Sequence, residues 1–298
     1  MRLIPKAFLV RPLLLAMAVL MVVSQRANAV EDTYFVTDHH HLHEAGNLGI
    51  ANYSVLGSPK KGNQYLGSQI EIEYRLTKWW ATEVQVNGQT TWNDSMIFTG
   101  YSWTNKFKLI PSNHWINSAL VVSWENGSAA DKCIAEIEGH GVEDEFALPN
   151  SIARKIHEQE MELKLVLSRD YKGWNFAGNV MGAKDFSGEP WEFGYSLGTS
   201  RPLSTADGQA QSCVFCRKSI SAGLEFYGGL GDAHSVGLQK TPQYLGPEMS
   251  WKLSERLAAK VGPHFGLTPT SQHVLVHFGM VYDIPDFSKR MTELFHGR

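Results

Sequence analysis

Four histidines stand close together near the start of the sequence, in the stretch TDHHHLHEAGN. They are His39, His40, His41 and His43, and Glu44 follows directly. Imidazole nitrogens at this density could hold Zn²⁺, Cu²⁺ or Ni²⁺, which favour nitrogen ligands. The same stretch could equally be a polar segment that binds metal only adventitiously, because its spacing matches no defined motif. The sequence therefore gives a candidate divalent-metal site and requires no other cofactor.

The three cysteines offer a second chemistry. Cys213 and Cys216 form a CVFC motif, whose spacing suits zinc, a redox pair or a local disulfide. The sequence has no second CxxC motif and no βαβ pattern, and Arg217 stands where haem attachment needs a histidine. In an exported protein we therefore expect a disulfide between Cys213 and Cys216. Cys133 is then an odd thiol, which could also form a metal site with His140.

Nucleophilic catalysis needs a serine near a histidine, with a polar group to orient the histidine. The available pairs are His234 with Ser235 and His273 with Ser271, and no flanking signature selects either pair. We therefore expect no catalytic residue. A surface lipid-modifying enzyme stays open as an alternative.

The start of the chain reads as an export signal. Basic residues precede the apolar run 13–23, and Ala27-Asn28-Ala29 matches a signal-peptidase site, so the mature chain is expected to begin at Val30. No later run reaches the ~18 apolar residues of a membrane helix. The net charge is −3, and the Lys and Arg residues form no basic stripe that would bind nucleic acid. The expected organisation is a signal peptide at 1–29, a His-rich segment at 30–46, a β domain at 47–285 and an extension at 286–298.

Period-2 alternation recurs along the mature chain and predicts twelve strands, each about 9 to 12 residues long. They are expected near 48–56, 65–76, 80–90, 96–109, 116–125, 158–168, 174–184, 191–200, 219–228, 244–253, 257–267 and 274–284. A short extra strand could form at 132–138, and a short helix could follow Pro285. Short turns on one side and long loops on the other would be typical of a membrane barrel.

The stretch YLGSQIEIEYRLTKWWATEVQV shows the alternation most clearly. Ile70 and Ile72 lie on one face of the expected strand, and Glu71 and Glu73 lie on the other. In a soluble barrel the apolar face points inward, whereas in an outer-membrane barrel it faces lipid and the lumen is polar. Alternation alone allows both arrangements.

Tryptophan placement and strand length favour the membrane arrangement. Tryptophan rings prefer the headgroup level, so both rims of a membrane barrel carry aromatic girdles. Eight of the nine tryptophans fall near an expected strand end, namely Trp79, Trp80, Trp92, Trp103, Trp115, Trp124, Trp174 and Trp191. Strands of this length also match a tilted membrane strand. The sequence thus predicts an all-β, antiparallel, up-and-down transmembrane β-barrel of about twelve strands, with a polar lumen and aromatic girdles, in the bacterial outer membrane.

The final expected strand, HVLVHFGMVYDI, adds a resemblance. It resembles the terminal strand of bacterial outer-membrane barrels, whose alternating aromatic pattern the barrel-assembly machinery reads. Two features depart from that pattern: Ile284 replaces the usual terminal Phe, and residues 285–298 extend beyond it. Across 48–284 the pattern also resembles, loosely, small transporter-type barrels of the MetA-pathway kind.

Charged residues on the polar faces are the expected lining of the lumen. These are Glu71, Glu73, Arg75, Glu83, Lys106, Glu160, Glu162 and Lys164. A lumen of about twelve strands lies between the filled and the open cases, so its diameter does not decide whether solute passes.

The sequence favours a channel or transporter for a small solute, in contact with outer-membrane lipid and monomeric. Three alternatives remain: a metal-handling barrel that uses the histidine cluster, a structural barrel whose lumen is closed by its own charged residues, and the surface lipid-modifying enzyme.

Overall fold

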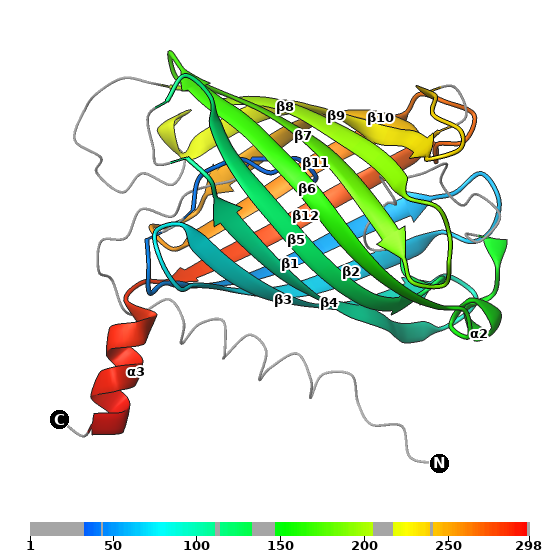
Figure 1. The fold of residues 1–298 in the computed structure, drawn as a ribbon, viewed down its shortest axis with the longest axis horizontal. Helices are drawn as coiled ribbons and strands as arrows, with labels where there is room; N and C mark the ends of the chain where they lie inside the picture. The colour runs from blue at the N-terminus through cyan, green and yellow to red at the C-terminus, as the bar shows by residue number, and fades with distance from the viewer. Residues whose placement is uncertain are drawn as a thin grey trace.

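The computed structural model describes residues 33–42, 44–110, 114–132, 147–204, 217–238 and 241–296. Within these residues, twelve antiparallel strands form one closed barrel in chain order, and β1 closes it by pairing with β12 as well as β2 (Figure 1). The strands are β1 (Leu48–Ser58), β2 (Tyr65–Arg75), β3 (Trp80–Thr91), β4 (Met96–Lys108), β5 (Asn117–Ser128), β6 (His157–Tyr171), β7 (Trp174–Asp185), β8 (Glu192–Pro202), β9 (Ile220–Asp232), β10 (Gln243–Lys252), β11 (Leu257–Gly266) and β12 (Val274–Ile284). The predicted fold class and strand number are confirmed.

Within the parts of the chain that the structure describes, helices are few and short. They are α2 (Asn150–Ala153), the 3-10 turn η2 (Arg217–Ser219) and α3 (Phe287–His296). The helix expected after Pro285 is α3, which leaves the barrel at the end of β12 (Figure 1). Among the described residues, no helix is both long and apolar enough to cross a membrane.

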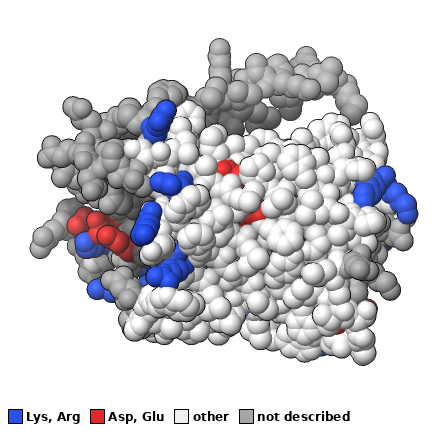
Figure 2. Space-filling model, turned by 90° about the horizontal axis from the view of Figure 1, so that it is seen from above, with Lys and Arg blue, Asp and Glu red and all other residues white. Residues whose placement is uncertain are grey.

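The apolar face of the alternating strands points outward. The side chains of Ile70, Ile72 and Val84 are 53%, 47% and 49% exposed, whereas Arg75 is 3% exposed. Figure 2 shows charged side chains gathered towards the two ends of the barrel, with a surface between them that is nearly free of charge. A face of this kind is stable against lipid and not against water. The soluble alternative, with the apolar face inside, is therefore wrong.

The tryptophan girdle is present only in part. Trp79, Trp92 and Trp115 lie just outside strand ends and are 53%, 46% and 71% exposed. Trp103 and Trp124, by contrast, pair with each other within β4 and β5, away from either rim. Their placement near strand ends was wrong: β5 runs to Ser128, three residues beyond the predicted strand 116–125, and Trp103 lies inside both the predicted strand 96–109 and β4.

The two ends of the barrel are named by the strand ends and connections that lie at each. The terminal end holds Leu48 at the start of β1 and Ile284 at the end of β12, and the opposite end is called the loop end. Connection length does not separate the two ends as predicted, because the long connection 203–219 lies at the terminal end. The short turn 267–273 lies at the loop end. The possible strand 132–138 falls almost entirely outside the described residues, and Lys132 itself is not in a strand.

Candidate lumen site

Most of the predicted lumen residues surround one cavity inside the barrel. The cavity has a volume of about 290 Å³. Its lining includes Glu71, Glu73, Arg75, Glu83, Lys106, Glu162 and Lys164. Glu160 lies on the same face of β6 as Glu162 but is not part of this lining. Their role in passing a solute stays a prediction.

The lumen also holds a stretch of chain that belongs to no strand. Residues 33–42, called the inserted segment, enter and return at the terminal end. His41 contacts Asp170 near the end of β6, and Thr33 contacts Ser250 near the end of β10. Between them the segment reaches deeper, where the Phe35 ring lies 6.2 Å from the ring of His264. The place of the histidines at the expected mature N-terminus allowed either the periplasm or the lumen, and the segment has no period-2 or helical pattern that would have indicated an insertion.

One wall of the barrel holds the backbone of the inserted segment. The carboxylate of Glu225 on β9 accepts hydrogen bonds from the backbone N–H groups of Phe35, Val36 and Thr37, the first two at 3.3 and 2.9 Å. On β11, the Lys260 ammonium donates to the Tyr34 carbonyl oxygen at 2.5 Å. A buried backbone group must find such a partner, so these wall residues replace the water that the segment loses.

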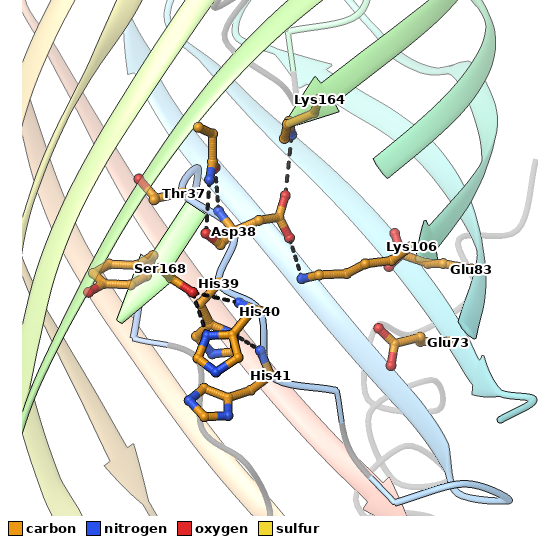
Figure 3. A network of polar contacts seen from close by, with 12 residues as sticks. Thr37, Asp38, His39, His40, His41, Glu73, Glu83, Lys106, Lys164 and Ser168 are labelled. Carbon is orange, nitrogen blue, oxygen red and sulfur yellow. Dashed lines mark hydrogen bonds and ion pairs between the residues drawn. The ribbon is translucent and has the colours of Figure 1, made fainter. Parts of the chain in front are cut away.

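The facing wall holds a side chain of the same segment. The Asp38 carboxylate contacts the ammonium groups of Lys106 on β4 and Lys164 on β6 at 2.8 and 3.4 Å (Figure 3). Strands β4 and β9 are five steps apart around the ring of twelve, so the segment bridges the lumen. Burial alone would raise the pKa of Asp38, but the two ammonium groups outweigh it and hold that pKa below its usual range.

The histidines of the inserted segment lie near the terminal end of the barrel. The backbone N–H of His40 donates to the Ser168 hydroxyl at 2.9 Å, and its ring Nδ1 lies 2.5 Å from the same oxygen. His41 Nε2 lies 2.7 Å from the Asp170 carboxylate. Burial, followed by the neighbouring His41, lowers the pKa of His40 to about 3. His40 is therefore neutral at pH 7.

The predicted metal site is only partly assembled. Ligand atoms of His40, His41 and Asp170 lie within 4.8 Å of one another, and Asp170 was not foreseen as a member. His39 lines the lumen cavity, where its ring packs edge-on against His41. His43 lies outside the described residues, as do Cys133, His140, Cys213 and Cys216. Metal binding at the cluster and the expected disulfide stay predictions.

Of the two serine–histidine pairs considered for catalysis, one has a buried serine and the other lies in an exposed turn. Ser271 is 1% exposed, and its hydroxyl exchanges hydrogen bonds with the backbone of Gln243. At the other pair, the backbone N–H groups of His234 and Ser235 both donate to the Asp232 carboxylate. Among the described contacts, neither serine hydroxyl bonds to its histidine ring.

The insertion itself can be tested by cross-linking. The hydroxyl oxygens of Thr33 and Ser250 lie 3.2 Å apart, so cysteines at both positions are expected to form a disulfide under mild oxidation. Mass spectrometry of unreduced peptides would detect it, with the three native cysteines replaced by serine. A pairing of Thr33→Cys with Ser102→Cys, on a strand six steps from β10, should give no link. Equal yields in both variants would place the segment elsewhere.

Comparisons with known proteins concern the barrel alone. No family model matches the chain, and no curated protein matches it. Among solved structures, the chain is similar to a KdgM porin in complex with disordered oligogalacturonate (11% identity, TM-score 0.46, 79% of this chain and 98% of that one). It is also similar to an outer membrane channel from Pseudomonas putida F1 (11%, 0.49, 83% and 98%) and to the NanC porin (9%, 0.45, 79% and 98%). The closed ring of twelve strands with its apolar face outward gives the chain the fold of an outer-membrane β-barrel, and residues 33–42 lie inside its lumen.

Proposed function

We propose that the protein is an outer-membrane channel for a small solute, closed in the described state by its inserted segment. The observation that carries this proposal is that residues 33–42 cross a polar lumen without forming any part of the wall. All strand pairings would remain if the segment left, because its contacts to the wall are side-chain hydrogen bonds and ion pairs. The segment is therefore suited to act as a removable plug.

A second barrier lies nearer the loop end. Tyr65, Tyr227 and Tyr244, called the tyrosine constriction, are 0%, 0% and 3% exposed within the barrel. Tyr227 and Tyr244 stack with ring centroids 5.3 Å apart, and the Tyr65 hydroxyl donates to the Gln272 side chain at 3.0 Å. Lys132, from the connection after β5, lies over the Tyr65 ring at 5.5 Å. Conduction requires both barriers to move, because they lie in series along the lumen.

Conductance in planar bilayers tests the proposal. We expect the wild type to be nearly silent, and deletion of residues 33–41 alone to leave conductance low. Adding Tyr65→Ala and Tyr244→Ala to that deletion should give steady single-channel steps. Each variant is first checked for the heat-dependent gel mobility of a folded barrel. A folded combined variant that stays silent would contradict the channel and favour the structural barrel, which the packed tyrosine constriction also supports.

The charge of the cavity indicates the class of solute. Among the described residues, seven carboxylates line it: Asp38, Glu71, Glu73, Glu83, Glu125, Glu162 and Asp283. Four cationic side chains of the same lining oppose them: Arg75, Lys106, Lys164 and Lys260. When water fills the lumen and these carboxylates are ionised, the formal difference of three favours entry of cations and disfavours anions, because a low-dielectric wall focuses such a field.

Ion selectivity provides a separate prediction. Glu71 and Glu73 lie with Glu83 within 4.8 Å. In the closed lumen carboxylates this close share protons, whereas in the water-filled lumen of an open variant they ionise and concentrate negative charge at one point. In the combined open variant, Glu71→Gln with Glu73→Gln should shift the reversal potential in a salt gradient towards that of a nonselective pore. Glu189→Gln in the connection before β8 serves as the control and should change nothing. An unchanged reversal potential in the double substitution would contradict a cation-selective lumen.

A further inference from the structure

A buried cluster of metal-ligating residues lies on three neighbouring strands, apart from the histidine-rich segment. Glu225 on β9, Glu248 on β10 and His264 on β11 are 0%, 3% and 0% exposed. One ligand atom from each lies within 4.8 Å of the other two. We propose that this cluster is a binding site for one first-row divalent cation of the Zn²⁺ type.

Distances within the cluster suit shared coordination. His264 Nε2 lies 3.2 Å from a Glu248 carboxylate oxygen and 3.9 Å from a Glu225 carboxylate oxygen. A zinc ion placed between the three atoms would need each of them at ~2.0–2.2 Å from the metal. Small inward movements of the side chains would be enough to reach these distances. Two carboxylates and an imidazole also match the ligand preference of this class of ion.

Outer contacts hold the ligands in place. His264 Nδ1 lies 2.9 Å from the Tyr227 hydroxyl, which leaves Nε2 directed at the two carboxylates. Metal-binding histidines almost always bond through their second nitrogen in this way. The Glu225 carboxylate is in turn fixed by backbone N–H groups of the inserted segment, including that of Val36 at 2.9 Å. The arrangement therefore has an outer shell as well as ligands.

His277 on β12 supplies an independent observation. Within the described part of the chain its Nε2 has no hydrogen-bond partner, its side chain is 8% exposed, and its ring centroid lies 4.6 Å from that of His264. Gly262 pairs with His277 across the sheet, and a Cβ there would lie 3.3 Å from His264 Nε2 and 3.2 Å from Glu248 Cγ. An alanine methyl at position 262 would therefore crowd both Glu248 and His264. His277 stands outside the group of atoms within 4.8 Å, and we assign it as a fourth ligand that would join by turning its ring towards the other three.

Charge gives the physical reason for a cation. Two carboxylates this deeply buried are costly unless a positive charge or shared protons compensate them. A divalent ion would neutralise both and would also fix Glu225, to which the inserted segment is bonded. Metal binding itself does not depend on the barrel conducting, so the site can be tested apart from the proposed function.

The test is metal binding by the folded full-length barrel. To remove other ligands, His39, His40, His41 and His43 are replaced by alanine, and all three cysteines, Cys133, Cys213 and Cys216, by serine. After chelation and dialysis, calorimetry with Zn²⁺ should show one tight equivalent per barrel. His264→Gln and Glu248→Gln should each weaken it by more than about 100-fold. His234→Gln, at an exposed loop histidine, should leave it unchanged.

Two further measurements exclude a trivial loss of folding. Gly262→Ala should weaken Zn²⁺ binding in a barrel with normal heat-dependent mobility, whereas Gly49→Ala should not, because its nearest neighbour lies 3.7 Å away. Co²⁺ bound to the same protein should change its visible absorption when His277 is replaced by glutamine. Absence of the tight equivalent once the His-rich segment is replaced would overturn the proposal, as would equal affinity in folded His264→Gln or Gly262→Ala.

Discussion

Replacing Asp38 by asparagine is expected to raise the fraction of molecules with the inserted segment outside the lumen by about 10- to 150-fold. Asparagine has the same shape and keeps the backbone contacts to Asn179 at 2.6 and 3.0 Å. It loses the charge that Lys106 and Lys164 contact. A hydrogen bond to a charged group contributes about 1.5–3 kcal/mol, which corresponds to that range.

The released fraction can be measured as a labelling rate. Thr33 is 4% exposed, so a cysteine at this position should react with a bulky water-soluble maleimide only after the segment leaves. The matched control is His41→Asn, which breaks the contact to Asp170. Both partners of that contact are substantially exposed, at 37% and 50%, so the rate should rise at most about fivefold. Equal rates in the two variants would show that Asp38 does not hold the segment.

Acidification from pH 7 to pH 5 is expected to increase the same released fraction about 25-fold. His40 has a pKa of about 3 in the lumen and should regain an ordinary pKa of about 6.5 when released. A lowered histidine pKa means that the released state binds more protons, so the inserted state is fully favoured above pH 6.5. It loses stability as the pH falls through that value towards 3.

The Asp38 contact does not supply this dependence. Asp38 has a pKa below its usual range, so it stays ionised in both states at pH 5. Around the His40 ring, Lys108 and His41 act in the same direction as burial, and Asp170 opposes them. His40→Asn should therefore remove most of the pH effect on maleimide labelling of the Thr33→Cys variant. A pH dependence that persists after this substitution would assign the titration to another group.

The wall of the barrel was predictable because the period-2 alternation of each strand can be read from that strand alone. Ile70 and Ile72 alternate with Glu71 and Glu73, and that local period fixes which side chains share a face. The choice between lipid and water as the outer medium needed a second property, strand length, since alternation is the same in both cases. The errors fall at strand ends, where Trp103 and Trp124 were placed too near the rim.

The contents of the lumen were not predictable in the same way. Asp38 meets Lys106 and Lys164 across separations of 68 and 126 residues, and no local pattern encodes such a contact. The Glu225, Glu248 and His264 cluster had a weak signal, because each is an inward polar residue on a strand that the sequence does predict. What was missing was the register between β9, β10 and β11, which decides whether inward residues on neighbouring strands meet.

The inserted segment is joined to the wall by a short tether. Only residues 43–47 separate it from β1, and the Gly46 backbone N–H bonds to the Arg75 carbonyl oxygen at the barrel mouth at 2.8 Å. A ligand held on so short a tether has an effective concentration in the millimolar range or above. A free solute that shares its contacts must therefore bind the lumen more tightly than the segment does, or arrive at comparable concentration, to replace it. The length of this tether, as well as the chemistry of the lumen, sets the solute concentration at which the channel would respond.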